Sequence, residues 1–234
     1  MIAPIDDTPP KPAPTGLAVD HIGVVVHDLG REVAAWRGLG FRVSDPVPLG
    51  QSSAHVVFEN GYVELSSPVP GSGNHLERYL AAGEGVRILV LAATDAAAAQ
   101  RIVAATHPGC AAPRPASRAI VVGGREDVAR FVWFPLPVDV VPDVLSAVVE
   151  HVTPDLVFHP SLVDHPNGAR RVTRFVVHGA ASALALPALP AFTGRDVPGL
   201  ACRDLPGAPA IAGFAVTGGA DSTERHFSLL PPVH

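Results

Sequence analysis

The chain has few of the residues that mark a disulfide-stabilised or strongly charged protein. Only two of its 234 residues are cysteine, Cys110 and Cys202, and they form neither a close pair nor a metal knuckle. This usage favours a reducing, cytoplasmic setting and leaves a single disulfide open. Charged residues make up 17% of the chain and the formal net charge is −5, so nucleic acid is not an expected partner.

Long apolar runs are missing as well. No stretch reaches the roughly 18 uninterrupted apolar residues that a membrane-spanning helix needs, so no membrane partner is expected. Residues 1–16 are acidic and proline-rich without an apolar centre, which predicts a flexible lead-in rather than a signal peptide. Hydrophobic residues nevertheless make up 47% of the chain, enough for a globular protein with a full core.

Three common catalytic motifs are also absent from the sequence. No G-x-S-x-G elbow is present, because PGSGN at 70–74 lacks the strand and helix that such an elbow joins. No glycine-rich loop for a dinucleotide or a phosphate follows a predicted strand. Neither cysteine lies in a recognisable basic pocket, so a thiolate nucleophile has little support.

The hydrophobic pattern predicts two similar units, each ordered strand, helix, strand, strand, strand. In the first unit a helix capped by Asp28 follows the first strand and ends at Gly40. The predicted strands of the first unit are 19–26, 41–47 and the two arms of a hairpin around Asn60-Gly61. In the second unit Asp95 caps the helix, and a helix-like insert at 142–151 precedes the last strand. The predicted strands of the second unit are 85–94, 118–122, 128–134 and 155–158.

A third, partial unit follows. A strand is predicted at 170–179, a short helix-like run at 181–192 and a closing hairpin at 211–219 and 225–231. Each full unit leaves one sheet face unburied, so an α+β fold is expected in which paired βαβββ modules form a cup-shaped half-barrel. The expected boundaries are 1–16 for the lead-in, 17–84 and 85–165 for the two modules, and 166–234 for the third. For residues 185–234 three alternative roles remain open: completing the cup, covering its mouth or making a homodimer contact.

FENGYVELSS at 58–67 is the strongest local signal. Asn60-Gly61 between two alternating runs predicts a two-residue type I′ turn, which pairs Val57 with Glu64 and His55 with Ser66. Alternation then separates an apolar face, expected under the helix, from a mixed face. The mixed face consists of His55, Val57, Tyr62, Glu64 and Ser66, and the apolar face of Val56, Phe58, Val63 and Leu65.

The mixed face is either solvated or the lining of a cavity, and an antiparallel sheet commonly wets one face. Pairing of the two units would curl this face inward. A buried Glu64 would then need a cation or hydrogen-bond donors, because an unpaired buried carboxylate is costly.

The repeated units, opened by VDHIGVVVHDL and closed by FENGYVELSS, with HPNGA at 165–169, resemble the vicinal oxygen chelate superfamily. Within it they look most like the glyoxalase-like domain group, and the resemblance covers residues 17 to 180. It implies a metal or a small-molecule substrate held inside the cup by ligands from the first and last strands of each unit.

The resemblance also implies particular ligands. His21 matches the first-strand ligand position and Glu64 the fourth-strand carboxylate. In the second unit the first-strand position falls on Arg87 or Ile88, which cannot replace the usual histidine, and the last-strand position falls on or near His159. The implied set of His21, Glu64 and His159 suits a divalent metal such as Fe, Mn, Zn or Ni.

Other residues are candidates for catalysis and substrate contact. His55, or Glu64 where no metal binds, is the candidate general base. Tyr62, Arg87 and Trp133 are candidates for substrate contact, although Trp133 also suits a core or a cavity wall.

The histidines of the chain also have plainer interpretations. A lone strand histidine such as His21 is often a buried structural residue. His151, His159 and His165 lie close together in the sequence but match no metal motif, so we assign them to a loop.

Three functional hypotheses remain. The first is an enzyme that chelates vicinal substrate oxygens and stabilises an enolate-like intermediate, with isomerase, lyase and dioxygenase reactions all open. The second is a metal-free small-molecule binding or resistance protein, which the missing second-unit histidine supports. The third is a catalytically inactive scaffold, which a solvent-exposed Glu64 would indicate.

Overall fold

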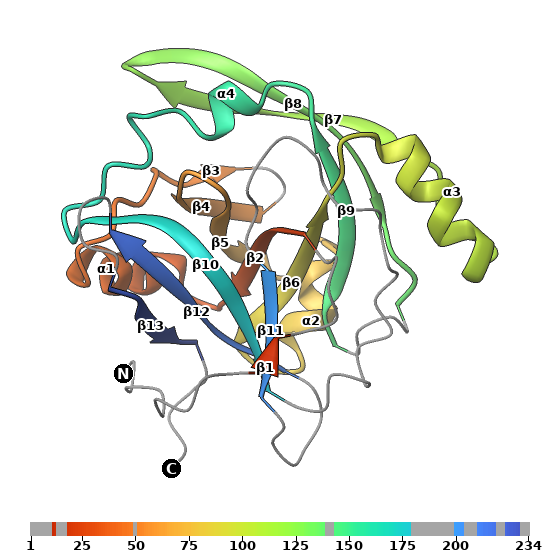
Figure 1. Ribbon diagram of the computed structural model, residues 1–234, viewed down its shortest axis with the longest axis horizontal. Coiled ribbons are helices and arrows are strands. Elements are labelled where there is room, and N and C mark those ends of the chain that lie inside the picture. The colour runs from red at the N-terminus through yellow and green to blue at the C-terminus, as the bar shows by residue number, and fades with distance from the viewer. Residues whose placement is uncertain are drawn as a thin grey trace.

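The strands of the computed structural model form two sheets, one of eight strands and one of five (Figure 1). The structure describes residues 11–12, 18–48, 51–138, 143–178, 199–203, 210–218 and 223–229. The large sheet has the order β3-β4-β5-β2-β6-β9-β8-β7. Its strands are β2 (Val19–Val25), β3 (Val47–Pro48), β4 (Gln51–Val57), β5 (Tyr62–Pro68), β6 (Gly85–Ala92), β7 (Arg114–Val122), β8 (Arg125–Pro135) and β9 (Leu145–His151). The helices are α1 (Leu29–Gly38), α2 (Leu76–Leu80), α3 (Ala96–Thr106) and α4 (Pro154–Val157).

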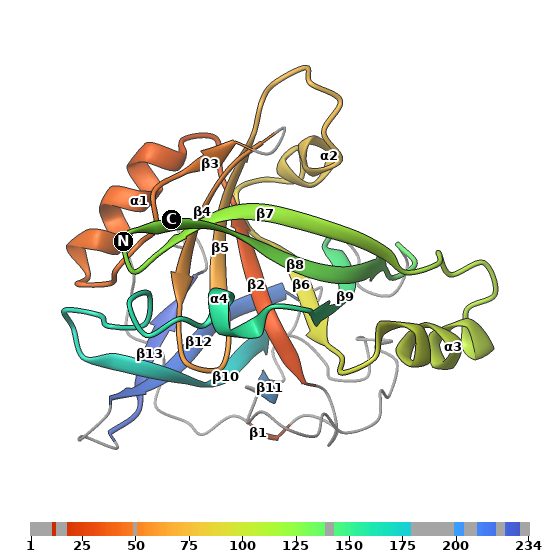
Figure 2. The same cartoon turned by 90° about the horizontal axis from the view of Figure 1, so that it is seen from above.

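The large sheet curls into the half-barrel that the repeated units predict. In Figure 2 the long β7–β8 hairpin crosses in front of β4, β5 and β2. Arg118 Nη1 of β7 comes within 3.4 Å of His55 Nδ1 on β4, so the two ends of the sheet approach each other. The predicted α+β cup is therefore confirmed, while the module boundaries at 84/85 and 165/166 stay a prediction.

The last part of the chain builds the second sheet, of order β1-β11-β10-β12-β13. Its strands are β1 (Lys11–Pro12), β10 (Ala169–His178), β11 (Gly199–Arg203), β12 (Ala210–Gly218) and β13 (Arg225–Ser228). The predicted strand at 170–179 and the closing hairpin are present, but in a separate sheet. Part of the predicted lead-in forms β1, whereas the rest of it and the helix-like run at 181–192 lie outside the described residues.

One hydrophobic core joins the outer face of the large sheet, α1 and the second sheet. Val56 and Val63 of the hairpin are fully buried there, on the face predicted to lie under the helix. Trp36 of α1 stacks on Phe214 of β12 with the ring centroids 5.6 Å apart. The second sheet thus covers the back of the cup and leaves its inner face to other side chains.

Both predicted helix caps are present, but the strand predicted at 41–47 is wrong except at its end. Asp28 and Asp95 accept hydrogen bonds from the backbone three residues on. Only Val47 and Pro48 pair with β4. Phe41 instead turns into the core, and the Arg42 N–H donates to His165 Nδ1 rather than to a neighbouring strand.

The sequence pattern also predicts the last strand of the second unit at the wrong residues. Residues 145–151, within the predicted helix-like insert, form β9, and residues 154–157, which overlap the predicted strand at 155–158, form α4. β9 lies between β6 and β8, so Ser146 to Val149 are buried on both faces and show no alternation. Pro154 stands at the start of α4, where its missing N–H costs nothing.

The β4–β5 hairpin keeps the predicted faces but not the predicted turn. Val57 pairs with Tyr62 and His55 with Glu64, a shift of two residues from the predicted register. A shift of two leaves every side chain on its face. The four residues 58–61 form the loop, and neither Asn60 nor Gly61 has positive φ. The tight two-residue turn occurs instead in the β7–β8 hairpin, where Gly123 and Gly124 have φ of 56° and 77°.

Asn60 explains why its loop is wider. Its side-chain amide donates to Val172 O at 2.8 Å and its oxygen accepts from Val172 N at 2.9 Å. The side chain is 3% exposed and fastens the hairpin to β10 as a neighbouring strand would. In a type I′ turn the Asn60 side chain would not point at Val172. The contact with the second sheet therefore determines the length and conformation of the loop.

Residues 165–168 form a second junction. His165 Nδ1 accepts from Arg42 N at 3.0 Å, and its Nε2–H donates to Val57 O at 2.9 Å. The Asn167 amide donates to Leu39 O after α1. Gly168 has φ of 76°, as a turn at Asn167-Gly168 predicts. None of the described helices is long and apolar enough to cross a membrane.

Asn60→Ala should lower the free energy of unfolding by about 1–3 kcal/mol, because it leaves the N–H and C=O of Val172 buried without partners. Asn60→Asp should also destabilise, since a carboxylate cannot donate to Val172 O. Urea unfolding measures both. The control, Glu59→Gln, removes only a surface pair with Arg171 and should change stability by less than about 1 kcal/mol. Wild-type stability of both Asn60 variants would contradict this account.

Acid should weaken the fold through His165. Burial lowers the pKa of His165 to about 4, and protonation of Nδ1 would break the bond from Arg42. The folded pKa is below the unfolded value near 6.5, so this stabilisation is complete above about pH 6.5 and is lost as the pH falls towards 4. Urea unfolding from pH 7 to 4 should show a loss of up to about 3 kcal/mol that His165→Gln lacks. Parallel pH profiles of the two proteins would rule this out.

Candidate active site

A cavity of about 460 Å³ occupies the inner face of the cup. Alternate residues of successive strands line it, so the strand period of two determines which side chains it receives. The polar half comes from β2, β4 and β5 and includes His21, Gln51, Ser53, His55, Tyr62 and Glu64. The apolar half comes from β6, β8 and β9 and includes Ile88, Val90, Phe131, Leu145, Ala147 and Val149. The volume suits a small molecule.

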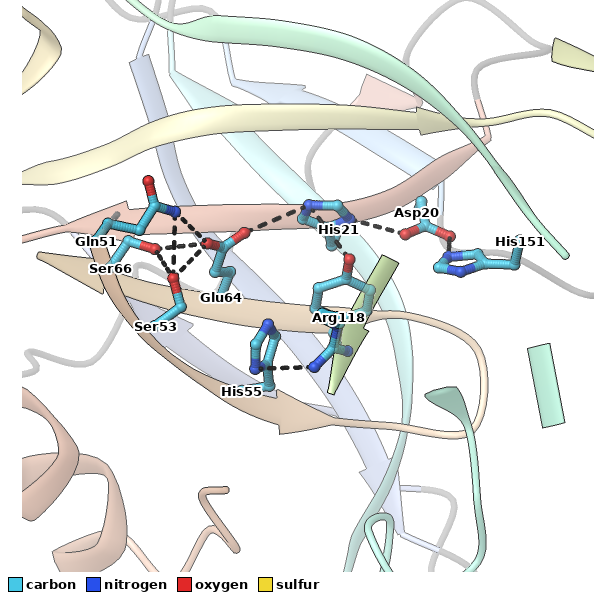
Figure 3. Close-up of polar contacts among 10 residues, drawn as sticks. Asp20, His21, Gln51, Ser53, His55, Glu64, Ser66, Arg118 and His151 are labelled. Carbon is cyan, nitrogen blue, oxygen red and sulfur yellow. Dashed lines mark hydrogen bonds and ion pairs between the residues drawn. The ribbon is translucent and has the colours of Figure 1, made fainter. Parts of the chain in front are cut away.

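Glu64 is held in one orientation by donors on a single side of its carboxylate. Its Oε1 accepts hydrogen bonds from Ser66 Oγ at 2.5 Å, Ser53 Oγ at 3.0 Å and Gln51 Nε2 at 3.4 Å (Figure 3). Its Oε2 lies 3.8 Å from His21 Nε2. The side chain is 15% exposed, so one oxygen is anchored and the other faces the cavity. Glu64 is therefore not the solvent-exposed residue that would indicate an inactive scaffold.

His21 stands beside Glu64 and stacks on Tyr62. The two ring centroids are 4.1 Å apart with an interplanar angle of 16°, and Tyr62 Oη lies 3.4 Å from His21 Nε2. On the other side, His21 Nδ1–H donates to Asp20 Oδ1 at 2.8 Å. This bond leaves Nε2 as the ring atom that faces Tyr62 and Glu64.

Asp20 is fully buried between two histidines, His21 and His151. His151 Nε2–H donates to Asp20 Oδ2 at 2.9 Å. Burial alone would raise the pKa of Asp20, but the charges and hydrogen bonds of His151 and His21 outweigh it and hold this pKa far below its ordinary value of 3.8. The carboxylate therefore stays ionised and ties β2 to the end of β9.

A β-bulge brings Asp20 to this position. Val19 pairs with Leu91 and His21 with Val90, so Asp20 is the extra residue on β2. Bulges re-aim side chains, and this one lets consecutive residues meet where strict alternation would separate them. Asp20 was not predicted for that reason. His151 was not predicted because the strand that carries it has the pattern of a helix.

His151 has one further buried atom. Its side chain is 9% exposed, and its Nδ1 has no hydrogen-bond partner among the described residues. His151 itself lines the cavity from the end of β9.

His55 lies directly across from Glu64 in the β4–β5 ladder and also faces the cavity. Burial, then the charges of Arg118 and His21, lower the pKa of His55 well below its ordinary value. His55 is therefore neutral near pH 7, and its Nδ1 faces the guanidinium of Arg118. Arg118 was not predicted, because the sequence does not indicate that β7 returns to β4.

The first-strand position of the second unit supplies no metal ligand to the cavity. Ile88 occupies the first-strand position in the cavity and packs on Gly23, where an added Cβ would lie 2.6 Å from Ile88 Cδ1. Arg87 is the extra residue of a second bulge and donates to the carbonyls of Ala82 and Gly83, so it does not line the cavity. The predicted substrate contact of Arg87 has no support from the cavity wall and stays a prediction.

His159 does not join the predicted metal ligands. It follows α4 in a loop, where its Nδ1 bonds Ser161 Oγ, and it is not part of the cavity wall. Across the described ranges no group of three or more His, Cys, Asp or Glu side chains is arranged to hold a metal ion. His21 and Glu64 are two adjacent ligands where a catalytic metal needs three, so the residues present do not fit the implied metal.

The wall near α2 combines aromatic and charged groups. Trp133 of β8 lines the cavity, as predicted, and the Arg114 guanidinium lies 4.2 Å from its ring centroid. His75, just before α2, also lines the cavity. Burial, opposed by the charge of Glu64, lowers the pKa of His75.

Comparison with known proteins supports the family resemblance. Residues 19–192 match the model of a family described as a glyoxalase-like domain. A structure of a hypothetical protein from Staphylococcus aureus is 9% identical, with a TM-score of 0.59 over 90% of this chain and 98% of that chain. This likeness extends the shared fold through both sheets. A comparison with curated proteins finds no match.

Two methylmalonyl-CoA epimerases are also similar to part of the chain. The one from Mycobacterium tuberculosis is 20% identical, with a TM-score of 0.42 over 58% of this chain and 91% of that chain. A variant of the one from Streptomyces coelicolor, in complex with 2-nitronate-propionyl-CoA, is 22% identical, with a TM-score of 0.40 over 59% of this chain and 99% of that chain.

Asp20→Asn should destabilise the protein by about 2–4 kcal/mol at neutral pH, because it removes a buried charge that binds two histidines. The folded pKa of Asp20 is depressed, so its contribution is present above about pH 4 and is lost below that value, where the unfolded chain takes up a proton. Between pH 5 and 3 the variant should therefore lose less stability than the wild type in urea unfolding. An equal loss in both proteins would show that Asp20 is not the ionised centre of this cluster.

Proposed function

The chain belongs to the glyoxalase-like domain family, and we propose that it is a small-molecule enzyme in which Glu64 removes a proton from a carbon next to a carbonyl group. The observation that carries this proposal is the asymmetric anchoring of Glu64. Three donors bind Oε1, while Oε2 faces a cavity with a largely apolar wall. A carboxylate held in this way has one basic atom presented to a ligand.

The proposed reaction forms an enolate-like intermediate. Glu64 Oε2 takes the proton, the C–H electron pair forms a C=C bond to the carbonyl carbon, and the C=O π pair moves to the oxygen, which acquires the negative charge. His21, when its ring carries both protons, directs Nε2–H towards the same space and would donate to that oxygen. Asp20 would stabilise this protonated ring and hold its orientation.

The intermediate can then follow either of two courses. Return of the proton to another face or carbon gives an isomerase, and loss of a leaving group gives a lyase. Vicinal oxygens on the substrate would make the proton acidic and spread the charge. The dioxygenase hypothesis and the divalent metal (Fe, Mn, Zn or Ni) are not part of this mechanism, because the donor set has two adjacent ligands.

His55 is a weaker candidate for the base. Its low pKa leaves it neutral but a poor proton acceptor, and its Nδ1 faces Arg118. We assign it instead to orienting Arg118 and separating that cation from Glu64. Tyr62 and Trp133 contribute the aromatic parts of the cavity wall.

A second function, a metal-free binding or resistance protein, is favoured by one observation. Strands β6, β8 and β9 present mainly apolar residues to the cavity, as a site for sequestering a hydrophobic molecule would. Such a protein would bind ligand with no need for Glu64.

Proton abstraction can be tested without knowledge of the natural substrate. The protein should catalyse deuterium incorporation at the carbon next to the ketone of 2-oxoisocaproate in D₂O, followed by proton NMR. Glu64→Gln should reduce the buffer-corrected rate roughly 100-fold or more, since it removes the base. Glu59→Gln, on the exposed tip of the same hairpin, should keep the wild-type rate.

Two results would reject this mechanism. Equal exchange rates in the wild type and in Glu64→Gln would show that Glu64 is not the base. Ligand binding by both proteins with no exchange in either would favour the binding-protein function. Elemental analysis of protein purified without chelators should find less than one divalent metal per chain, and chelator treatment should leave exchange unchanged.

A further inference from the structure

Arg118 extends across the opening of the cup, where the last strand of the large sheet returns to β4. It lines the active-site cavity together with His55 (Figure 3). Both residues also line a second cavity of about 520 Å³, between residues 42–47 and β7. Arg118 is therefore a partly buried residue on the boundary between the two cavities, and a ligand in either cavity could contact it.

The charge of Arg118 is not balanced within the described part of the chain. Five other arginines there have carboxylate partners, in the pairs Arg31–Glu84, Arg37–Asp45, Arg170–Asp164, Arg171–Glu59 and Arg174–Glu224. Arg118 has no described carboxylate within ion-pair distance, and its hydrogen-bond partner is His55 Nδ1 at 3.4 Å. A contact of that length to a neutral ring is weak. The planar fork of donors is left to bind a planar anion.

The other arginines near the cavity differ from Arg118 in this respect. Arg114 lies on the same strand, but it is exposed and covers the ring of Trp133. Arg42 donates to the carbonyl of Asp164, and its side chain lines only the second cavity. Arg118 is the only arginine or lysine among the described residues that line the active-site cavity.

We propose that Arg118 binds a carboxylate of the substrate, so that the enzyme acts on small organic acids with an apolar remainder. The apolar remainder would face Ile88, Val90, Ala147 and Val149 on β6 and β9. Glu64 repels a substrate carboxylate because both are negative, and Arg118 attracts it. The two charges together therefore favour one orientation of the acid in the cavity. His55, neutral and opposite Glu64, separates the two charged positions.

This arrangement would orient the substrate for the proposed reaction. With the carboxylate on Arg118, the rest of the acid extends into the cavity towards Glu64 and His21. The carboxylate part of the inference stands on Arg118 alone, whereas the position of the reacting C–H rests on the proposed function. The two parts are therefore separable by experiment.

Binding of 2-oxoisocaproate and of its uncharged methyl ester, measured by calorimetry, tests the carboxylate site. Glu64→Gln serves as the parent protein, since it removes the proposed base and leaves Arg118 in place. The parent should bind the acid roughly 10- to 100-fold more tightly than the ester, as a charge-assisted pair predicts. Arg118→Gln in that parent should remove the preference, and Arg118→Lys should restore part of it. The matched control Arg114→Gln, on the same strand, should keep it.

The opposing explanation is that Arg118 is a structural tie between β7 and β4. It predicts that Arg118→Gln lowers thermal stability and leaves the acid-to-ester ratio unchanged, and that result would overturn the proposal. Absence of a preference in the parent, or failure to bind 2-oxoisocaproate, isovalerate and phenylpyruvate alike, would also overturn it. A preference that depends on Arg118 in a wild-type protein without proton exchange would uphold the carboxylate site and reject the proposed function.

Discussion

The site depends on one buried charge, the carboxylate of Asp20 between His21 and His151. A carboxylate without solvent is stable only with partners, and here two imidazoles on different strands supply them. The interaction sets the ring orientation of His21, which in turn presents Nε2 to Tyr62 and Glu64. It also connects the first module of the cup to the last strand of the second. The orientation of His21 and the tie between β2 and β9 thus depend on the same ion cluster.

The two halves of the cavity have different chemistry although they arise from similar modules. The first module contributes the polar groups, with Glu64 held by Gln51, Ser53 and Ser66. The second contributes Arg118, His151 and a mainly apolar wall, where Ile88 takes the place that a ligand would need and Gly23 makes room for it. With Glu64 and His21 both on the first module, the site is one-sided. We infer that such a site holds its substrate by shape, by one base and by one cation.

Much of the fold follows from local patterns in the sequence. The caps at Asp28 and Asp95, the two repeated units and the two faces of the β4–β5 hairpin were all predicted, because each depends on neighbours in the chain. The predictions were wrong where contacts with a distant segment of the chain override the local preference. Asn60-Gly61 has the composition of a type I′ turn, but the Asn60 side chain pairs with Val172 and widens the loop. β9 was predicted as a helix, because a strand buried on both faces shows no alternation.

The sequence by itself determined that Glu64, Tyr62 and His55 share one face, since a strand alternates with a period of two whatever surrounds it. It also predicted that His21 lies on the first strand of the same unit, and the family resemblance implied that this strand lies beside Glu64. Only the tertiary structure decided that this face is a cavity, that Asp20 and His151 complete it, and that Arg118 faces it from the far end of the sheet. A bulge and the closure of a curled sheet depend on contacts between residues far apart in the chain, and no local pattern encodes them.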